Sequence, residues 1–362
     1  MTRLVFAIPG DLNTMTGGYG YDRRIIAALP QFGIEVETRR LADRFPFPTE
    51  ADLTAAVASL TKDRGTAVVM IDGLAYGALP AACIKAIGAP IIGLVHHPLA
   101  YEAGLSEITQ KVLHASEKTA LSLAQHVIAT SPTTGKALED DFAVPANKIT
   151  IAEPGTDLAQ RAIGSGAPNG RVDLLAVGAV VPRKAYDVLI QALSEIADLN
   201  WHLRIVGAMD RAPDTVRELR DQISRLHLDE RIEWMGECPS EQLEPLYHHC
   251  DVFVMSSHYE GFGMALTEAM AHGLPILSTT GGAAAQTIEE GAALKIPPAD
   301  VPAMAQALRL LISDPAQRAK LSEAAWSAAG RLTQWDESAR LIADVIHALD
   351  SGQTAKLSKE LK

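Results

Sequence analysis

Two glutamates eight positions apart, Glu260 and Glu268, are the residues of this chain whose type and spacing point most directly to chemistry. The apolar run 252–255 before them predicts a buried strand, and the stretch 264–272 predicts a helix. One carboxylate therefore lies in a loop at a strand end, and the other lies in the first turns of the next helix. Carboxylates accept hydrogen bonds from hydroxyl groups, and the N-terminus of a helix binds anions. The pattern predicts a site for a ligand with both features, such as a nucleotide sugar with its diphosphate and sugar hydroxyls.

A basic pair, Arg183 and Lys184, follows another predicted strand, 174–177, in the same half of the chain. Arginine can hold a phosphate with two parallel hydrogen bonds, and lysine offers a compact charge. The pair could also be a solvated surface turn, but its place at a strand end favours phosphate binding. The sequence contains no Asp-x-Asp triplet for a divalent ion. We therefore expect no metal, and we expect this pair and the helix N-terminus to stabilise a departing diphosphate.

In the first half, small and polar residues follow two predicted strands. A loop with Gly17 and Gly18 follows the first strand and can approach a phosphate closely. It lacks the Gly-x-Gly-x-x-Gly dinucleotide pattern, so NAD is not expected. His96 and His97 come directly after a later strand, where a histidine can donate to a sugar hydroxyl or move a proton. The alternative, one ring held by the backbone and the other exposed, carries equal weight.

Short apolar runs alternate with amphipathic segments along the chain, and the runs predict the strands that position these residues. The expected strands of the first half are Leu4–Ile8, Val68–Ile71, Ile91–Val95, Val127–Ala129 and Ile149–Ala152. Those of the second half are Leu174–Val177, Leu203–Val206, Ile232–Met235, Val252–Met255 and Pro275–Ser278. The alternation predicts an α/β fold with two Rossmann-like parallel-sheet domains facing across a cleft. A stretch rich in glycine and proline, 159–171, reads as the linker between them.

Composition excludes several other classes of protein. The net charge of −12 over 362 residues argues against nucleic-acid binding, which needs a basic face. Three cysteines lack metal-ligand spacing and are expected to be reduced thiols. No apolar run is long enough for a transmembrane helix, and the apolar start reads as a strand and not as a signal peptide. These features predict a cytoplasmic protein. The negative charge is concentrated after residue 150, so any weak peripheral membrane contact would fall to the first half.

With these residues in place, the chain resembles family 4 of the retaining glycosyltransferases, which have the GT-B fold of two Rossmann-like domains. The strongest part of the resemblance is the segment 260–275, in which Glu260-Gly261-Phe262-Gly263 leads to Glu268-Ala269-Met270-Ala271 and then Gly273-Leu274-Pro275. The weaker marks, in the expected order, are Gly17-Gly18, Pro154-Gly155-Thr156-Asp157, Gly178 with Arg183-Lys184, and Gly281-Gly282. Two positions depart from the family. Ala185 stands where a glycine is common, which matters only if its φ is positive, and Gln286 stands where an acidic residue is common.

The resemblance implies a role for each part of the chain. It implies an N-terminal acceptor-side domain in 1–160, a nucleotide-sugar donor domain in 171–330, a helix in 331–350 that crosses back to the first domain, and a flexible tail in 351–362. The implied catalytic residues are Glu260, His96, Lys184 and Arg183. The implied donor-binding residues are Gly17, Gly18, Arg183, Lys184, Met235, Gly261, Phe262, Gly263, Met264, Ala265 and Glu268. The implied acceptor-binding residues are His97, Tyr101 and Glu102.

The function that follows is a hexosyltransferase reaction. The enzyme would move a hexose from a nucleotide diphosphate sugar to a hydroxyl acceptor (a saccharide, a lipid-linked acceptor or a small molecule). The resemblance implies retention of anomeric configuration, no metal and no cofactor. Two alternatives stay open at this point: a nucleotide-sugar epimerase or phosphorylase on the same fold, and a non-catalytic nucleotide-sugar binding module.

Overall fold

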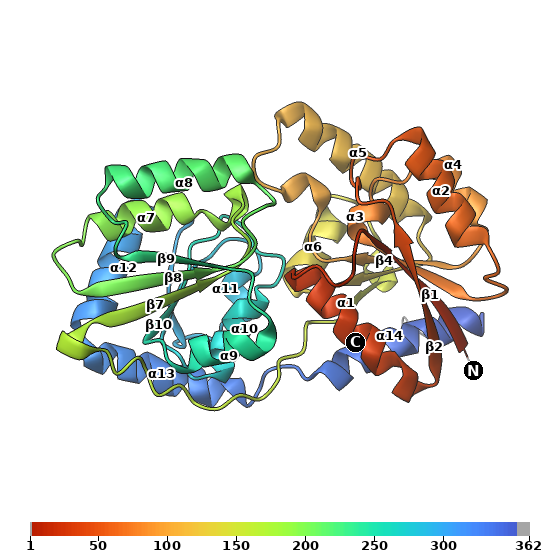
Figure 1. Cartoon of the computed structure of the whole chain (residues 1–362). Helices are drawn as coiled ribbons and strands as arrows, with labels where there is room; N and C mark the ends of the chain where they lie inside the picture. The colour runs from red at the N-terminus through yellow and green to blue at the C-terminus, as the bar shows by residue number, and fades with distance from the viewer. Residues whose placement is uncertain (1, 353–362) are drawn as a thin grey trace. The chain divides into compact units, whose positions relative to one another are not determined.

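The computed structural model describes residues 2–352, apart from the side chain of Ser240, and it divides into two compact units (Figure 1). Unit 1 comprises Met1–Gly155 with Thr333–Lys362, and unit 2 comprises Thr156–Leu332. Each unit contains a six-stranded sheet in which every strand pair is parallel. The predicted class, α/β with two Rossmann-like parallel sheets, is confirmed. Most of the predicted tail, 351–362, lies outside the described residues.

Unit 1 has the strand order β2-β1-β3-β4-β5-β6. Its strands are β1 (Thr2–Pro9), β2 (Ile34–Leu41), β3 (Val68–Asp72), β4 (Ile91–Val95), β5 (His126–Ala129) and β6 (Ile149–Ile151). Its helices are α1 (Gly17–Ala28), α2 (Glu50–Thr61), α3 (Gly73–Tyr76), α4 (Ala81–Ile87), α5 (Glu107–Leu123), α6 (Pro132–Asp140) and α14 (Trp335–Asp350). Central strands such as β3 and β4 are buried along their whole length. They read as continuous apolar runs because helices cover both faces of a parallel sheet.

Unit 2 has the strand order β12-β11-β10-β7-β8-β9. Its strands are β7 (Val172–Val177), β8 (Trp201–Val206), β9 (Ile232–Gly236), β10 (Val252–Met255), β11 (Ile276–Thr279) and β12 (Ala293–Ile296). Its helices are α7 (Tyr186–Ser194), α8 (Pro213–Arg225), α9 (Ser240–His248), α10 (Met264–Ala271), α11 (Ala284–Thr287), α12 (Val301–Ser313) and α13 (Pro315–Ala329).

Strand order determines where each unit can bind a ligand. In unit 2 the chain runs outward from β7 to β8 and β9 and then returns to place β10 on the other side of β7. In unit 1 it runs from β1 to β2 and then returns to place β3 on the other side of β1. The loops after the two central strands diverge at such a switch point and leave a crevice at their carboxyl ends. Ligand-binding residues are therefore expected in the loops after β7 and β10 and in those after β1 and β3.

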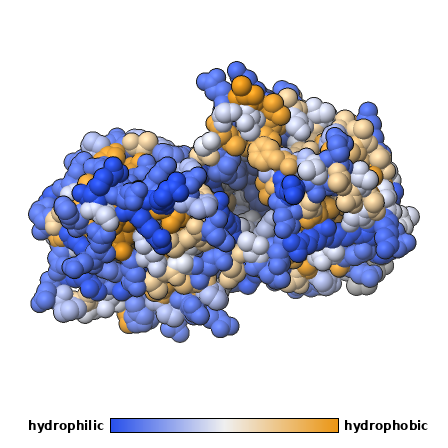
Figure 2. Space-filling view, turned by 45° about the horizontal axis from the view of Figure 1, so that its top comes forward, coloured by the Kyte–Doolittle hydropathy of each residue, from blue (hydrophilic) through white to orange (hydrophobic). Residues whose placement is uncertain are grey.

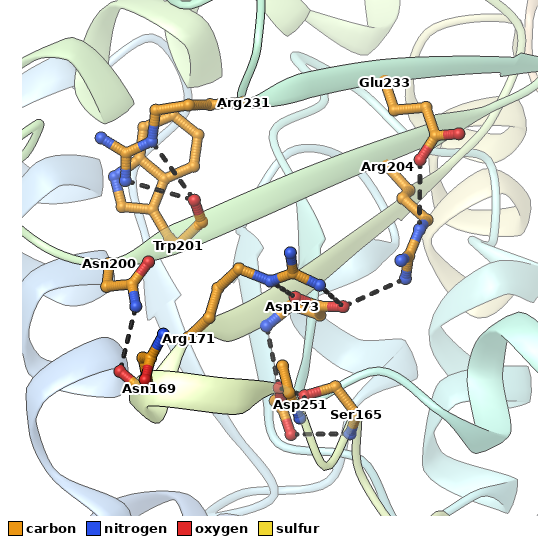
Figure 3. Close-up of polar contacts among 11 residues, drawn as sticks. Ser165, Asn169, Arg171, Asp173, Asn200, Trp201, Arg204, Arg231, Glu233 and Asp251 are labelled. Carbon is orange, nitrogen blue, oxygen red and sulfur yellow. Dashed lines mark hydrogen bonds and ion pairs between the residues drawn. The ribbon is translucent and has the colours of Figure 1, made fainter.

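The segment 159–171 is fixed to unit 2 by hydrogen bonds. Ala162 N–H donates to the carbonyl of His272 at 2.8 Å. The Ser165 hydroxyl donates to Asp251 at 2.6 Å, and the same carboxylate accepts from the Asp173 N–H at 2.8 Å. Figure 3 shows that Asp173 in turn meets the guanidinium of Arg171, at 2.7 Å. These contacts lie near the starts of β7 and β10, at the opposite end of the sheet from the loops that follow these strands.

Helix α14 belongs to unit 1, where it packs against α1. The Trp335 ring lies 5.9 Å from the ring of Tyr21, and the guanidinium of Arg24 lies 5.0 Å above the Trp335 ring. A side chain at Gly155 would place its Cβ only 2.3 Å from the Trp335 backbone nitrogen, so the chain needs glycine there. The apolar residues of its amphipathic pattern, Ala339, Ile342, Val345 and Ile346, are buried.

The surface in the view of Figure 2 is mainly polar, with small and separate apolar patches. On α5 the side chains of Ile108 and Val112 are exposed. Within residues 2–352, no helix has the length and apolar character that crossing a membrane requires.

Candidate active site

The loops after β7 and β10 bring two cations and one carboxylate together in unit 2. Lys184 Nζ lies 2.7 Å from Glu260 Oε1, and Arg183 Nη1 lies 3.3 Å from Glu260 Oε2. Arg183 also donates to the carbonyl of Tyr259 at 2.7 Å. All three charged side chains are largely buried, with exposed fractions of 16%, 13% and 8% for Arg183, Lys184 and Glu260. The predicted catalytic residues of this unit thus form one cluster with a net positive charge.

Backbone contacts between three loops hold this cluster in place. His258 N–H donates to the carbonyl of Arg183 at 2.8 Å, which joins the β10 loop to the β7 loop. Glu260 N–H donates to the carbonyl of Gly281 at 3.1 Å, which joins the β10 loop to the β11 loop. The Ser257 hydroxyl donates to Glu260 Oε1 at 2.5 Å. These contacts tie the Glu260 backbone to the β11 loop and its carboxylate to Ser257.

The charges around Glu260 determine its protonation state. Burial raises the pKa of Glu260, but the charges of Lys184 and Arg183 outweigh burial and lower it to about 2. The carboxylate is therefore ionised at neutral pH and can accept hydrogen bonds, but it cannot act as a general acid. The cost of burying this charge is offset by its two cationic neighbours.

The second glutamate, Glu268, lies on α10 in a different environment. The Tyr247 hydroxyl, from α9, donates to Glu268 Oε2 at 2.8 Å, and the Tyr247 ring stacks on His272 at 5.2 Å. Burial raises the pKa of Glu268, while the Tyr247 hydrogen bond and the charge of Lys184 act in the opposite direction.

Helix α10 begins without a side-chain cap. Gly263 precedes it in a left-handed conformation, with φ 97°, and has no side chain with which to cap the helix. Ala185, at the start of α7, is also left-handed, with φ 50°. The family's usual glycine would fit this conformation without strain, so the alanine is not a neutral departure.

In unit 1, the ends of β3 and β4 and the first turns of α1 bring a second group of polar side chains together. His96 Nε2 lies 3.3 Å from Asp22 Oδ1 and 3.4 Å from Asp72 Oδ2. The ring also meets Tyr21 edge to face, at 5.4 Å. A Cβ at Gly18 would lie 3.3 Å from the His96 ring. Three polar groups with ligand-like spacing are also a geometric candidate for a metal ion.

The other predicted residues are placed as follows. Gly17 is the first residue of α1, and Met235 lies half-buried near the end of β9. His97 Nε2 lies 3.2 Å from Glu102 Oε2, so two of the predicted acceptor residues pair with each other. The hydroxyl of the third, Tyr101, donates to Asp141.

Sequence reasoning missed Asp22, Asp72, Tyr247 and Ser257. Asp72 directly follows a predicted strand, and that position at a strand's carboxyl end could have identified it. Asp22 and Tyr247 lie inside helices, and only the structure shows which side chains they meet.

Comparisons with known proteins agree with this architecture. The family model described as Glycosyltransferase Family 4 matches residues 23–160, and the model described as Glycosyl transferases group 1 matches residues 162–327. Among solved structures, sucrose-phosphate synthase from Thermosynechococcus elongatus covers 97% of this chain and 100% of its own, with a TM-score of 0.82 and 20% identity. HepE from Anabaena, in complex with UDP and glucose, covers 96% of this chain and 100% of its own, with a TM-score of 0.76 and 18% identity.

Curated relatives are more similar in sequence over shorter stretches. Mannosylfructose-phosphate synthase from Agrobacterium fabrum is 32% identical over 181 residues, which is 46% of this chain and 40% of that protein. D-inositol 3-phosphate glycosyltransferase from Stackebrandtia nassauensis is 27% identical over 241 residues, 62% of this chain and 54% of that protein. The chain thus spans about half the length of the curated relatives it matches.

The fold and the two family models define the class: the chain is one of the glycosyltransferases with the GT-B fold. Within that class it belongs to glycosyltransferase family 4.

Proposed function

We propose that the protein transfers a hexose from a nucleotide diphosphate sugar to a hydroxyl acceptor, with retention of configuration and without a metal ion. The observation that carries the proposal is the buried cluster of Lys184, Arg183 and Glu260 at the switch point of unit 2. A crevice with two fixed cations beside a carboxylate suits a ligand that has both a diphosphate and hydroxyl groups. The complex of HepE with UDP and glucose gives the same pairing of ligands on the same fold.

Each residue of the cluster has a proposed part in the reaction. The diphosphate binds to Lys184, Arg183 and the uncapped N-terminus of α10. Each charge-assisted hydrogen bond contributes about 1.5–3 kcal/mol. Glu260 accepts from hydroxyls of the hexose, and Glu268 accepts from those of the ribose. The bond between the anomeric carbon and the phosphate oxygen breaks while the bond to the acceptor oxygen forms on the same face. The acceptor proton passes to the departing phosphate, and the cations stabilise the charge that develops there.

The acceptor is assigned to unit 1 on less specific grounds. His97, Tyr101 and Glu102 follow β4, at the same sheet edge as His96. Their imidazole, phenol and carboxylate groups suit an acceptor with several hydroxyls. Any weak contact with a membrane surface, and the expected cytoplasmic location, stay predictions.

The proposal is tested by measuring release of nucleoside diphosphate. A panel of nucleotide sugars is first screened by thermal shift, because a ligand that binds the native state raises Tm. The best donor is then incubated with candidate hydroxyl acceptors, and the anomeric configuration of the product is read by NMR in the presence of EDTA. We expect one donor class to raise Tm and to react with retention despite EDTA. No Tm shift with any nucleotide sugar, an inverted product, or loss of activity with EDTA would each contradict a stated part of the proposal.

Tyr247→Phe is expected to weaken donor binding while leaving the chemistry largely intact. The change removes the hydroxyl that orients Glu268 but keeps the ring that stacks on His272. Loss of one hydrogen bond to a charged group corresponds to about 1.5–3 kcal/mol. We expect the KM for the donor to rise by roughly 10-fold, with kcat within about 3-fold of the wild type. Steady-state kinetics with the donor varied measure this. An unchanged donor KM would show that Tyr247 does not position Glu268 for binding.

A further inference from the structure

The environment of Asp22 in unit 1 is unusual for an acidic residue. Its side chain is fully buried in α1, and within the described residues neither carboxylate oxygen accepts a hydrogen bond of good geometry. His96 Nε2 lies 3.3 Å from Asp22 Oδ1. Asp72 Oδ2 approaches the same nitrogen at 3.4 Å, while the other Asp72 oxygen accepts from the Leu74 N–H at 2.8 Å. Two carboxylates therefore converge on one ring nitrogen.

Burial makes this arrangement informative. An ionised carboxylate without donors is costly in the protein interior, so such a group is either protonated or paired with a cation. Burial raises the pKa of Asp22, and the charge of His96 opposes that rise. Burial by itself lowers the pKa of His96, but Asp22 and Asp72 outweigh burial and raise it well above its ordinary value. His96 thus favours the charged form of Asp22, and both carboxylates favour the charged form of His96, whereas Asp72 raises the pKa of Asp22.

The remaining neighbours do not supply another cation. On α1, Tyr21 faces the ring with its edge, and its hydroxyl donates to the Ala152 carbonyl at 2.9 Å. Gly18 leaves room for the ring, since a Cβ there would lie 3.4 Å from Nε2. The next residue along the chain, His97, lies against the Glu102 carboxylate, at 3.2 Å. Above the raised pKa of Asp22, about 6, the described residues offer these two carboxylates a proton on His96 as their cation, and a metal ion is the alternative.

We propose that Asp22 and Asp72 are positioning residues that hold His96 as an imidazolium with its Nε2–H directed into unit 1. Nδ1–H is then the ring donor that a bound substrate meets. On the function proposed above, this makes His96 a fixed cationic hydrogen-bond donor to a sugar or acceptor hydroxyl. It also excludes His96 as a general base, because an imidazolium has no lone pair with which to accept a proton.

A metal ion is the competing explanation. The spacing of the three ligand atoms is compatible with a small divalent cation. However, Nε2 and both Asp22 oxygens are buried, which leaves little room for the additional ligands that such a cation requires. A proton on His96 supplies one positive charge without further ligands, and Asp72 also accepts from the Leu74 N–H, so we favour the proton.

Nitrogen NMR of the full chain tests the proposal without any assay of activity. Protein labelled with ¹⁵N-histidine is titrated from pH 6 to pH 9, and His96 is assigned by comparison with His96→Gln. We expect both His96 nitrogens to have protonated shifts across this range. His126 is an internal reference for the neutral ring, because burial lowers its pKa to about 4. A neutral His96 at pH 7.5, or a coordinated Nε2 whose signal changes on EDTA treatment, would overturn the proposal.

Asp72→Asn tests the role of charge most directly. The asparagine side-chain oxygen can still accept from the Leu74 N–H, while the negative charge is lost. If the imidazolium depends on both carboxylates, the His96 titration in this variant moves to lower pH. Asp22→Asn serves as a second variant, and thermal melts show whether each is folded. An unchanged His96 titration in both folded variants contradicts the positioning role.

Kinetics then test the consequence for the reaction separately. In Asp72→Asn, kcat should fall on the alkaline side as His96 loses its proton, by ~10–100-fold between pH 6.5 and 8.5. The wild type should keep its rate across that range. NMR could show an imidazolium while kcat of Asp72→Asn does not fall with pH. That result would show that Asp22 and Asp72 hold His96 in its charged form but that transfer does not use the His96 N–H. Absence of any transfer activity would remove the proposed function and leave the NMR result standing.

Discussion

Lys184→Met is expected to lower kcat/KM by on the order of 10³, because it removes the cation that lies against both Glu260 and the proposed diphosphate site. Methionine keeps much of the length and apolar volume of the lysine stem, so the change is mainly one of charge. Removing a single preorganised donor to developing negative charge costs about 10²–10³ in rate, and loss of ground-state binding adds to this. Lys136→Met, on the exposed face of α6, is the matched control and should keep wild-type kinetics. Activity of Lys184→Met within tenfold of the wild type would contradict the assigned role.

The same variant should also be less stable, and in a pH-dependent manner. Loss of the Lys184 ammonium group leaves Glu260 with Arg183 and Ser257 as partners. Breaking a buried ion pair costs about 3 kcal/mol. The folded-state pKa of Glu260, about 2, lies below its ordinary value of 4.5. The ion pairs therefore stabilise the fold above pH 4.5, and this contribution is lost as the pH falls toward 2. The difference in unfolding free energy between wild type and Lys184→Met should be largest near pH 7 and smaller at pH 3, as measured by urea denaturation.

A double variant separates the two effects. Lys184→Met with Glu260→Gln removes the buried charge that the single variant leaves behind. We expect it to recover part of the lost stability but none of the lost activity, because coupled neighbours are not additive. A double variant as unstable as the sum of the two single variants would show that the two side chains do not interact.

The sequence predicted that Lys184 and Glu260 lie at the same edge of the sheet, but it did not predict that the two side chains touch. Periodicity located the strands, and parallel strands end at one edge of a sheet, so both residues were expected at that edge. Their direct contact depends on β10 lying beside β7, a long-range pairing that local patterns do not contain. The edge strands β2 and β12 were missing from the predicted set, because edge strands are partly exposed and carry polar residues that break the apolar run.

Residues that act through a neighbour were the hardest to predict. Asp22 lies on the buried side of α1, where hydrophobic periodicity leads one to expect an apolar residue. Tyr247 is an ordinary buried aromatic in sequence, and only its hydroxyl contact with Glu268 distinguishes it. Ala185 differs from these residues, because the resemblance to the family already singled out its position. Whether alanine in place of glycine causes strain there depends on φ, which only the structure shows to be positive.

Gly281→Ala is expected to destabilise unit 2 and to displace Glu260, although no charged group is changed. The added Cβ would lie 2.2 Å from the His258 carbonyl oxygen and 2.7 Å from its carbon, so backbone would have to move. The Gly281 carbonyl accepts from the Glu260 N–H at 3.1 Å, and any shift of this loop is transmitted to the carboxylate. Overpacking of this kind costs about 1–3 kcal/mol, and the donor KM should rise as well because the cluster loses its geometry.

Gly330→Ala, at the end of α13, provides the matched control, because the same methyl group would meet only the Ser327 carbonyl at 4.0 Å. Its φ of −66° suits alanine, so no strain is expected. Thermal melts should show Gly281→Ala lowered by about 3–8 °C and Gly330→Ala within about 1 °C of the wild type. If Gly281→Ala instead keeps both the wild-type Tm and the wild-type donor KM, the two loops are not packed as closely as the structure places them. The Glu260 carboxylate would then owe its position to its side-chain partners Lys184, Arg183 and Ser257.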